Sequence, residues 1–69
     1  MSNLFTPPRT VKFDIQSADS NAYFIIAAWS KQARHENWDQ DAVETVRQSA
    51  KSEDYANLIS TIVEHSKFP

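Results

Sequence analysis

The chain contains no glycine, and this absence constrains its turns more tightly than any other feature of the sequence. Glycine is the residue that enters left-handed backbone conformations without steric cost. Each tight turn must therefore use Asn, Asp, Ser or Pro, so these residues indicate where helices and strands end. Glycine-rich phosphate-binding loops, as found in nucleoside-triphosphate and dinucleotide sites, are excluded for the same reason.

A chain of 69 residues can hold one domain. Domains of this size bury about 60% of the surface that the unfolded chain exposes, and they commonly gain stability from a disulfide, a metal ion or a second subunit. The sequence has no cysteine, which excludes disulfides and thiolate zinc sites. We therefore expect self-association, as a homodimer or a higher oligomer.

The N-terminal part of the sequence predicts an arm followed by one strand. Residues 1–9 include two consecutive prolines, which cannot donate backbone hydrogen bonds, and we expect a flexible N-terminal arm here. Residues 10–16 alternate polar and apolar side chains, as a half-buried strand does, with Val11, Phe13 and Ile15 as the apolar set. No second strand is evident downstream. The strand therefore either packs on the helices as an extended segment or pairs with its copy in a second chain.

The first of three predicted helices spans about residues 21–36, with Asp19 or Ser20 as its expected N-cap. Its first half is apolar on almost every side, whereas an amphipathic surface helix shows a single apolar stripe. We therefore expect this helix to lie centrally, covered by several elements or by another subunit. Asn37 is expected to end it in a left-handed conformation, in place of glycine.

Two shorter helices are predicted to follow. Asp39 is the expected N-cap of a helix over about residues 40–50, and Ser52 is that of a third helix that ends near His65. Both segments carry apolar residues at helical spacing. Residues 10–69 therefore predict a single α+β domain that is mostly helical, with one N-terminal β-strand followed by three short α-helices.

The sequence shows no catalytic or metal-binding motif. The only histidines are His35 and His65, neither of which falls in a ligand spacing such as His-Glu-x-x-His, and both are expected to be solvated residues at helix ends. Paired acids for acid–base catalysis could come from Asp39, Asp41 and Glu44 or from Glu53 and Asp54, but both sets fall in first helical turns, where carboxylates are favoured in any case. No serine lies in a nucleophile-elbow motif. We therefore expect no enzymatic activity, no metal and no cofactor.

Aromatic residues make up 12% of the chain, which is more than a domain of this size buries easily. Aromatic residues left at a surface, Tyr and Trp above all, are preferred interface anchors. The three aromatics of the first helix are therefore candidates for a contact surface, unless they are plain core residues. The candidate partner or self-association surface comprises Val11, Phe13, Ile15, Tyr23, Phe24 and Trp29.

A net charge of −2 lacks the basic surplus of a dedicated nucleic-acid binder. Basic residues nevertheless flank the strand and recur one turn apart on the first helix, at Arg9, Lys12, Lys31 and Arg34. A ribbon of paired strands carrying Lys12 would fit a major groove, although Asp14 on the same strand face would oppose phosphate. Nucleic acid is therefore the less favoured partner.

The longest apolar run has eight residues, whereas about 20 are needed to span a bilayer. The N-terminus also lacks a basic region followed by an apolar stretch, so no secretory signal is expected. We therefore expect a cytoplasmic protein without a membrane anchor.

Two segments of the chain are similar to a known group of proteins. Residues 14–28 read D-I-Q-S-A-D-S-N-A-Y-F-I-I-A-A, and residues 52–62 read S-E-D-Y-A-N-L-I-S-T-I. They resemble a family of very short, poorly characterised proteins of tailed bacteriophages and other mobile elements, whose helices open with Asn-Ala-aromatic and with Ser-Gly-Asp-Tyr. Ser20 and Glu53 stand where that family usually has glycine. The matched positions are Asn21, Ala22, Tyr23, Asp54, Tyr55 and Leu58.

The resemblance implies an accessory phage gene product without a general catalytic activity. Short phage proteins of this kind often act by binding a host protein. By analogy, we expect a protein–protein interaction module that inhibits or modulates a host protein stoichiometrically in the host cytoplasm. The alternative is a small nucleic-acid-binding or transcriptional regulatory protein that uses a strand ribbon.

Overall fold

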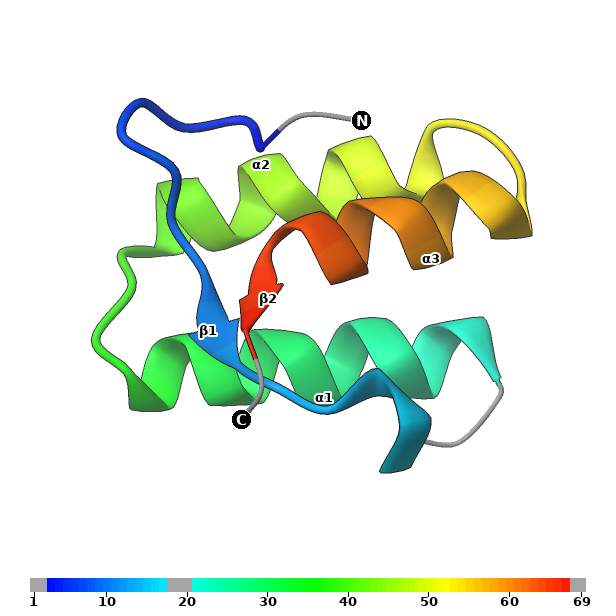
Figure 1. Cartoon of the computed structure of the whole chain (residues 1–69), viewed down its shortest axis with the longest axis horizontal. Coiled ribbons are helices and arrows are strands. Elements are labelled where there is room, and N and C mark those ends of the chain that lie inside the picture. The colour runs from blue at the N-terminus through cyan, green and yellow to red at the C-terminus, as the bar shows by residue number, and fades with distance from the viewer. Residues whose placement is uncertain (1–2, 18–20, 68–69) are drawn as a thin grey trace.

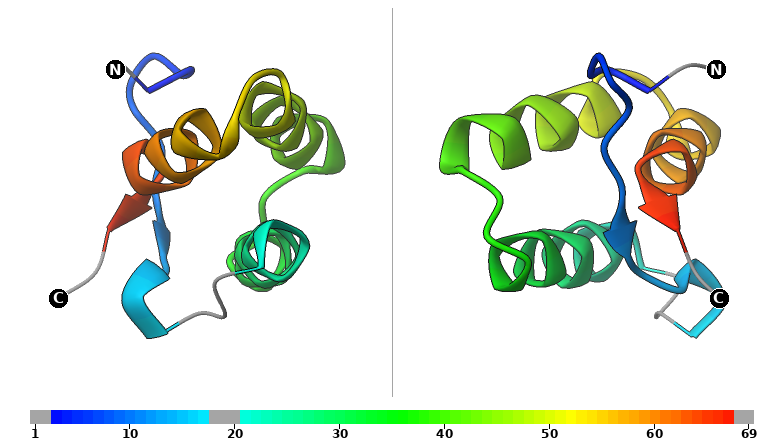
Figure 2. Two further views of the ribbon diagram at one scale, coloured as in Figure 1. Left: turned by 90° about the vertical axis from the view of Figure 1, so that its right-hand side faces the viewer. Right: turned by 60° about the vertical axis from the view of Figure 1, so that its left-hand side comes forward.

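The computed structural model of the chain describes residues 3–17 and 21–67. Within these residues, three α-helices and a short pair of strands surround one core (Figure 1, Figure 2), which confirms the predicted mostly helical α+β fold. In chain order the elements are β1 (Val11–Lys12), the 3-10 helix η1 (Ile15–Ser17), α1 (Ala22–His35), α2 (Gln40–Lys51), α3 (Tyr55–Glu64) and β2 (Ser66–Lys67).

The N-cap of α1 is Asn21. Its side-chain oxygen accepts a hydrogen bond from the backbone N–H of Tyr23 at 2.9 Å, which satisfies one of the free amides of the first turn. The sequence analysis expected Asp19 or Ser20 in this role, and both lie outside the described residues. Cap-forming residues are adjacent here, so cap preference alone does not choose among them.

The N-cap of α3 is Asp54, which accepts a hydrogen bond from the N–H of Asn57 at 2.9 Å. The expectation that Ser52 caps this helix is therefore wrong, because Ser52 instead ends α2. Asp39 caps α2 as predicted, by accepting from the N–H of Ala42 at 3.1 Å. The turn between α2 and α3 contains several residues with a short polar side chain, and the packing of the two helices decides which of them acts as the cap.

Asn37 adopts the left-handed conformation that the sequence predicts, with a φ of 69°. Its N–H donates to the carbonyl of Arg34, and the N–H of Trp38 donates to the carbonyl of Ala33, both at 3.0 Å. These are the two hydrogen bonds of a Schellman motif, which satisfies the last carbonyls of a helix. The chain therefore reverses at Asn37 without glycine and turns Trp38 back toward the core.

The strand predicted over residues 10–16 is shorter than expected and has its partner in the same chain. β1 pairs in parallel with β2, with Val11 opposite Ser66 and Lys12 opposite Lys67. The prediction that no second strand follows is wrong, because a strand of two residues leaves no periodic pattern in the sequence. This ladder needs no second chain, so the pairing across a dimer that the sequence left open is not required.

The alternation over residues 10–16 nevertheless predicts the inner and outer faces of this segment. Val11 is buried, and the side chains of Phe13 and Ile15 are partly buried against the core. Lys12 and Gln16, between and after them, are exposed. The period-two pattern thus predicts correctly which side chains of this segment are buried, although the β-strand itself ends at Lys12.

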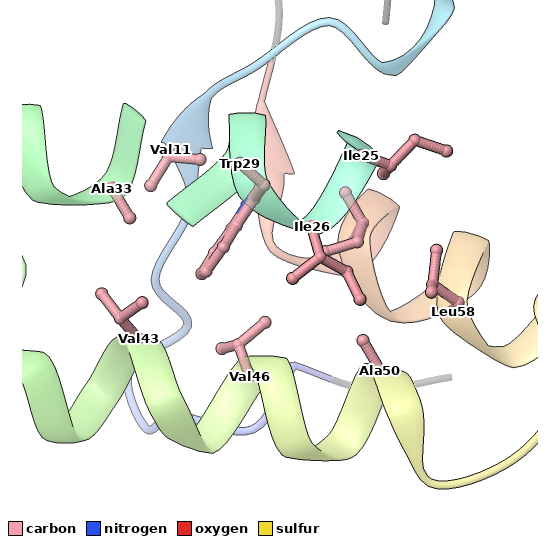
Figure 3. Close-up of a cluster of buried hydrophobic side chains, with 10 residues drawn as sticks. Val11, Ile25, Ile26, Trp29, Ala33, Val43, Val46, Ala50 and Leu58 are labelled. Atoms are coloured by element: carbon pink, nitrogen blue, oxygen red, sulfur yellow. The ribbon is translucent and has the colours of Figure 1, made fainter. Parts of the chain in front are cut away.

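Trp29 of α1 lies at the centre of the core. Its side chain is 0% exposed, and its indole N–H donates to the backbone carbonyl of His65 at 3.2 Å. Figure 3 shows the ring between β1 and α2, pointing toward Val43 and Val46. The core also contains Val11, Ile25, Ile26, Ala33, Ala42, Ala50, Leu58 and Ile62. Ala42, Val43, Val46 and Ala50 form the buried stripe of α2, which confirms the apolar residues at helical spacing that the sequence predicts for this segment.

The described part of the predicted arm, residues 3–9, lies against the C-terminal end of α3. The side-chain amide of Asn3 donates to the carbonyl of Arg9 at 2.7 Å and to the last carbonyl of α3 at 2.9 Å. The ring of Phe5 meets Trp38 and His65 edge-on, with centroid separations of 5.5 and 5.7 Å. The segment is therefore placed by tertiary contacts that its own sequence does not indicate.

Candidate interaction surface

Helix α1 buries one face and exposes the other. Ile25, Ile26 and Trp29 face the core, whereas Tyr23 and Phe24 are 80% and 61% exposed. Coverage of this helix by several elements of the same chain is therefore wrong for its opposite side, which the other elements leave open, whereas coverage by another subunit stays a prediction. We call that side the α1 outer face; it comprises Tyr23, Phe24, Ala27, Ala28, Lys31, Arg34 and His35.

Of the six residues predicted for a partner surface, only Tyr23 and Phe24 are well exposed. Val11 and Trp29 are 1% and 0% exposed, so neither can contact a partner while the protein is folded. The two remaining strand residues are partly buried, as described above. The alternative that the helix aromatics are core residues holds for Trp29 alone, since the other two lie on the opposite side of α1.

An open groove lies beside Tyr23, where the start of α1, the end of α2 and the start of α3 meet, and we call it the aromatic groove. It has a volume of about 380 Å³. The buried side chains of Ile26, Ala50 and Leu58 form its floor, and the exposed rings of Tyr23 and Tyr55 flank it. The other lining residues are Ala22, Lys51, Glu53 and Asp54. An apolar floor between two tyrosines is suited to receive an apolar side chain of a protein partner.

The second half of the α1 outer face is basic. Lys31, Arg34 and His35 are exposed there and line a shallow depression on the helix. α1 contains no Asp or Glu, although the whole chain has a net charge of −2. Within residues 3–17 and 21–67, neither Lys31 nor Arg34 forms an ion pair with an acidic side chain. Their charges are therefore directed to solvent.

Glu36 follows α1 and links its C-terminal end to β1. Its carboxylate accepts hydrogen bonds from the backbone N–H of Lys12 at 2.7 Å and from the side-chain amide of Gln32 at 2.8 Å. Partial burial acts to raise the pKa of Glu36, but these hydrogen bonds, together with the positive charges of Lys12 and His35, outweigh it and lower the pKa. The carboxylate is therefore ionised at neutral pH and holds the two elements together.

The four basic residues of the nucleic-acid alternative lie on three different parts of the fold. The guanidinium carbon of Arg9 lies 4.2 Å from the ring centroid of Trp38, and its Nη1 lies 3.7 Å from a carboxylate oxygen of Asp39. Arg9 is thus engaged at the turn between α1 and α2. Lys12 lies on β1, whereas Lys31 and Arg34 are together on the α1 outer face.

His65 is buried, so the expectation that it is a solvated residue at a helix end is wrong. The side chain is 1% exposed: Nδ1 lies 2.7 Å from the carbonyl of Thr61, and Nε2 accepts from the N–H of Leu4 at 3.1 Å. One ring nitrogen faces an acceptor and the other faces a donor, so the proton is on Nδ1. His65 therefore joins the N-terminal segment to α3. Its partner Leu4 is 61 residues away in sequence, so no local pattern could have indicated this role.

Within the described ranges, no three His, Asp or Glu side chains gather closely enough to hold a metal ion. In the same part of the chain, no helix combines the length and apolarity that crossing a bilayer requires. Comparisons with known protein families, curated proteins and solved structures find no match to this chain. The functional argument therefore rests on the chemistry of the aromatic groove and of the α1 outer face.

Proposed function

We propose that this protein is an interaction module that binds a protein partner through the aromatic groove and the adjoining aromatic half of the α1 outer face, which carries Tyr23 and Phe24. The observation that carries the proposal is the exposure of Tyr23 and Phe24, at 80% and 61%. Large aromatic side chains gain about 1.5–3 kcal/mol each when they leave water, so a partner that covers them binds favourably. Tyrosine is also one of the residue types that dominate binding energy at interfaces.

The proposed mechanism is stoichiometric. An apolar side chain of the partner enters the aromatic groove and contacts Ile26, Ala50 and Leu58, while Tyr23 packs over it from the edge of α1. Binding then occupies a functional surface of the partner and inhibits or modulates it. The resemblance of residues 14–28 and 52–62 to short phage proteins supports the further proposal that the partner is a protein of the host cytoplasm.

A tagged pull-down from bacterial lysate, with and without nuclease, tests the proposal. We expect one protein to be recovered in near-equal amount by the wild type, unaffected by nuclease, and to be lost with Tyr23→Ala. Alanine keeps the helix propensity of α1, so circular dichroism should show the same helix content for both. Val63→Ala is the matched control, because Val63 is 49% exposed on α3 and lies outside the proposed surface.

Two results would contradict the interaction module. The first is a partner that Tyr23→Ala and Phe24→Ala retain as well as the wild type does, since the aromatic surface would then be irrelevant to binding. The second is recovery of nucleic acid, or of proteins that disappear after nuclease treatment, because the captured species would then be held through nucleic acid.

A nucleic-acid-binding function is the second candidate, and one observation favours it: Lys31 and Arg34 are exposed on the same helix face as Phe24, on a helix without acidic residues. Aromatic rings next to basic residues are typical of single-strand binding surfaces. The strand ribbon first considered for this role is not available, because β1 has two residues and pairs with β2. Fluorescence anisotropy with single-stranded and duplex DNA tests this candidate, which requires an affinity that falls steeply with salt.

A further inference from the structure

We propose that the partner segment is an acidic, amphipathic helix that lies along α1, with apolar residues at one end and carboxylates at the other. This inference rests on the proposed function and adds the chemistry of the partner. It is carried by the division of the α1 outer face into an aromatic half and a basic half.

The residues of this face form a continuous strip along the helix. Phe24, Ala28, Lys31 and His35 are three or four residues apart, so they follow one line along the helix surface. Tyr23 begins a second line beside the first, and Tyr23 itself flanks the aromatic groove. The strip runs from residue 23 to residue 35, which is about 18 Å at about 1.5 Å per residue. A partner helix of about three turns would cover it.

Charge complementarity decides which partner fits. The basic half presents Lys31 and Arg34 without an acidic neighbour on α1, and no ion pair within the described residues involves either side chain. Cations in the last turn offset the helix dipole, which accounts for Arg34 and His35 but does not account for the exposed rings about three turns earlier. A segment with carboxylates opposite Lys31 and Arg34 would neutralise the basic half, and apolar side chains opposite Phe24 would cover the aromatic half.

A second copy of the chain is a poorer occupant of this face. Two α1 helices packed in parallel would place Lys31 and Arg34 against their own copies, and like charges repel. Two helices packed antiparallel would cover these cations with the exposed rings of the copy's α1, a helix that carries no carboxylate of its own. The nearest acidic residues, Glu53 and Asp54, line the aromatic groove beside that helix. Neither arrangement therefore places a counter-charge of α1 opposite the basic half.

A nucleic-acid strand is also a poorer occupant. Tyr23 and Phe24 are consecutive, so their side chains diverge by about 100° around the helix and do not form one stacking platform. The basic residues are confined to one end of the strip, whereas a phosphate backbone carries charge along its whole length. The chain outside α1 also holds all nine Asp and Glu residues, and they oppose a long polyanion.

The experiment is a selection from a displayed library of random 16-residue peptides against the immobilised full chain. We expect the enriched peptides to combine Leu, Ile, Phe or Trp at helical spacing with two or more Asp or Glu toward one end. A synthetic copy of the most enriched peptide is then measured by fluorescence anisotropy. We expect Lys31→Glu or Arg34→Glu to weaken its affinity at least tenfold, and Lys67→Glu, which makes the same charge change on exposed β2, to leave it within twofold.

The results separate this inference from the proposed function. Peptides that bind through Tyr23 but show no acidic preference, or that tolerate Lys31→Glu, would overturn the acidic partner while the interaction module stands. Peptides that also tolerate Tyr23→Ala would overturn both. Tighter, Lys31-dependent binding of a 20-nucleotide single-stranded DNA would assign the basic half to nucleic acid. Sedimentation that shows a dimer abolished by Phe24→Ala would assign the strip to a second copy of the chain.

Discussion

Replacing Trp29 by alanine tests whether this side chain is a core residue or an interface residue. The ring is 0% exposed, and alanine in its place leaves a cavity whose cost is about 3–5 kcal/mol for Trp→Ala in a protein core. The carbonyl of His65 loses the indole N–H but keeps a hydrogen bond from the N–H of Val11 at 3.0 Å. No acceptor is left unsatisfied, so the loss is one of packing.

This loss is large for so short a chain. At about 0.05–0.15 kcal/mol per residue, 69 residues give a total stability of about 3–10 kcal/mol. We therefore expect Trp29→Ala to be mostly unfolded or to melt at least about 12 °C lower, since about 4–8 °C is lost per kcal/mol in domains of this size. The assay is urea and thermal unfolding followed by circular dichroism at 222 nm, which does not depend on tryptophan fluorescence.

Tyr23→Ala is the matched control, because Tyr23 lies on the same helix but is 80% exposed. Exposed substitutions of this kind change stability by no more than about 0.5 kcal/mol. A folded Trp29→Ala variant that unfolds at the same urea concentration as Tyr23→Ala would refute the argument. Trp29 would then contribute no more than a surface residue, and the packing of α1 described above would be wrong.

Three further predictions concern single side chains. His65→Ala should lower the free energy of unfolding by about 2–4 kcal/mol, because it empties a core position and leaves the Leu4 N–H without its acceptor. In the wild type, ¹⁵N NMR of the neutral His65 ring should show the proton on Nδ1. Glu36→Gln should destabilise the protein at pH 7, and this loss should fade as the pH drops through the lowered folded-state pKa of Glu36, because a carboxyl with a lowered pKa stabilises the fold above its unfolded pKa and loses that effect as it is protonated. Urea titrations that show an equal loss at neutral and at strongly acidic pH would contradict this. Asn37→Ala should cost about 1 kcal/mol and Asn37→Gly nothing, since alanine resists the φ of 69° that glycine adopts freely, and equal unfolding midpoints would argue against a left-handed turn.

The candidate surface could be predicted from the sequence only in part. The apolar first half of α1 showed that aromatic side chains were available, and the excess of aromatics over core space indicated that some would remain exposed. The sequence did not show which aromatic side chains remain exposed, because Tyr23, Phe24 and Trp29 lie on a segment that is apolar on nearly all sides. The groove depends on Ala50, Tyr55 and Leu58 of other elements, so no local pattern contains it.

Features that depend on residues close together in the chain could be predicted from the sequence. The left-handed turn at Asn37, the cap at Asp39 and the buried stripe of α2 all follow from spacings of four residues or fewer, and all are present in the fold. The acid-free composition of α1 is likewise a property of the sequence alone.

Three features depend on the packing of distant segments: the buried side of α1, the pairing of β1 with β2 and the place of His65 in the core. The indole of Trp29 meets the carbonyl of His65 across 36 residues, and Leu4 meets the His65 ring across 61. Contacts at such separations leave no periodic trace, because they depend on how the helices pack against one another. The same packing leaves Tyr23 and Phe24 in solvent, and the proposed function depends on that exposure.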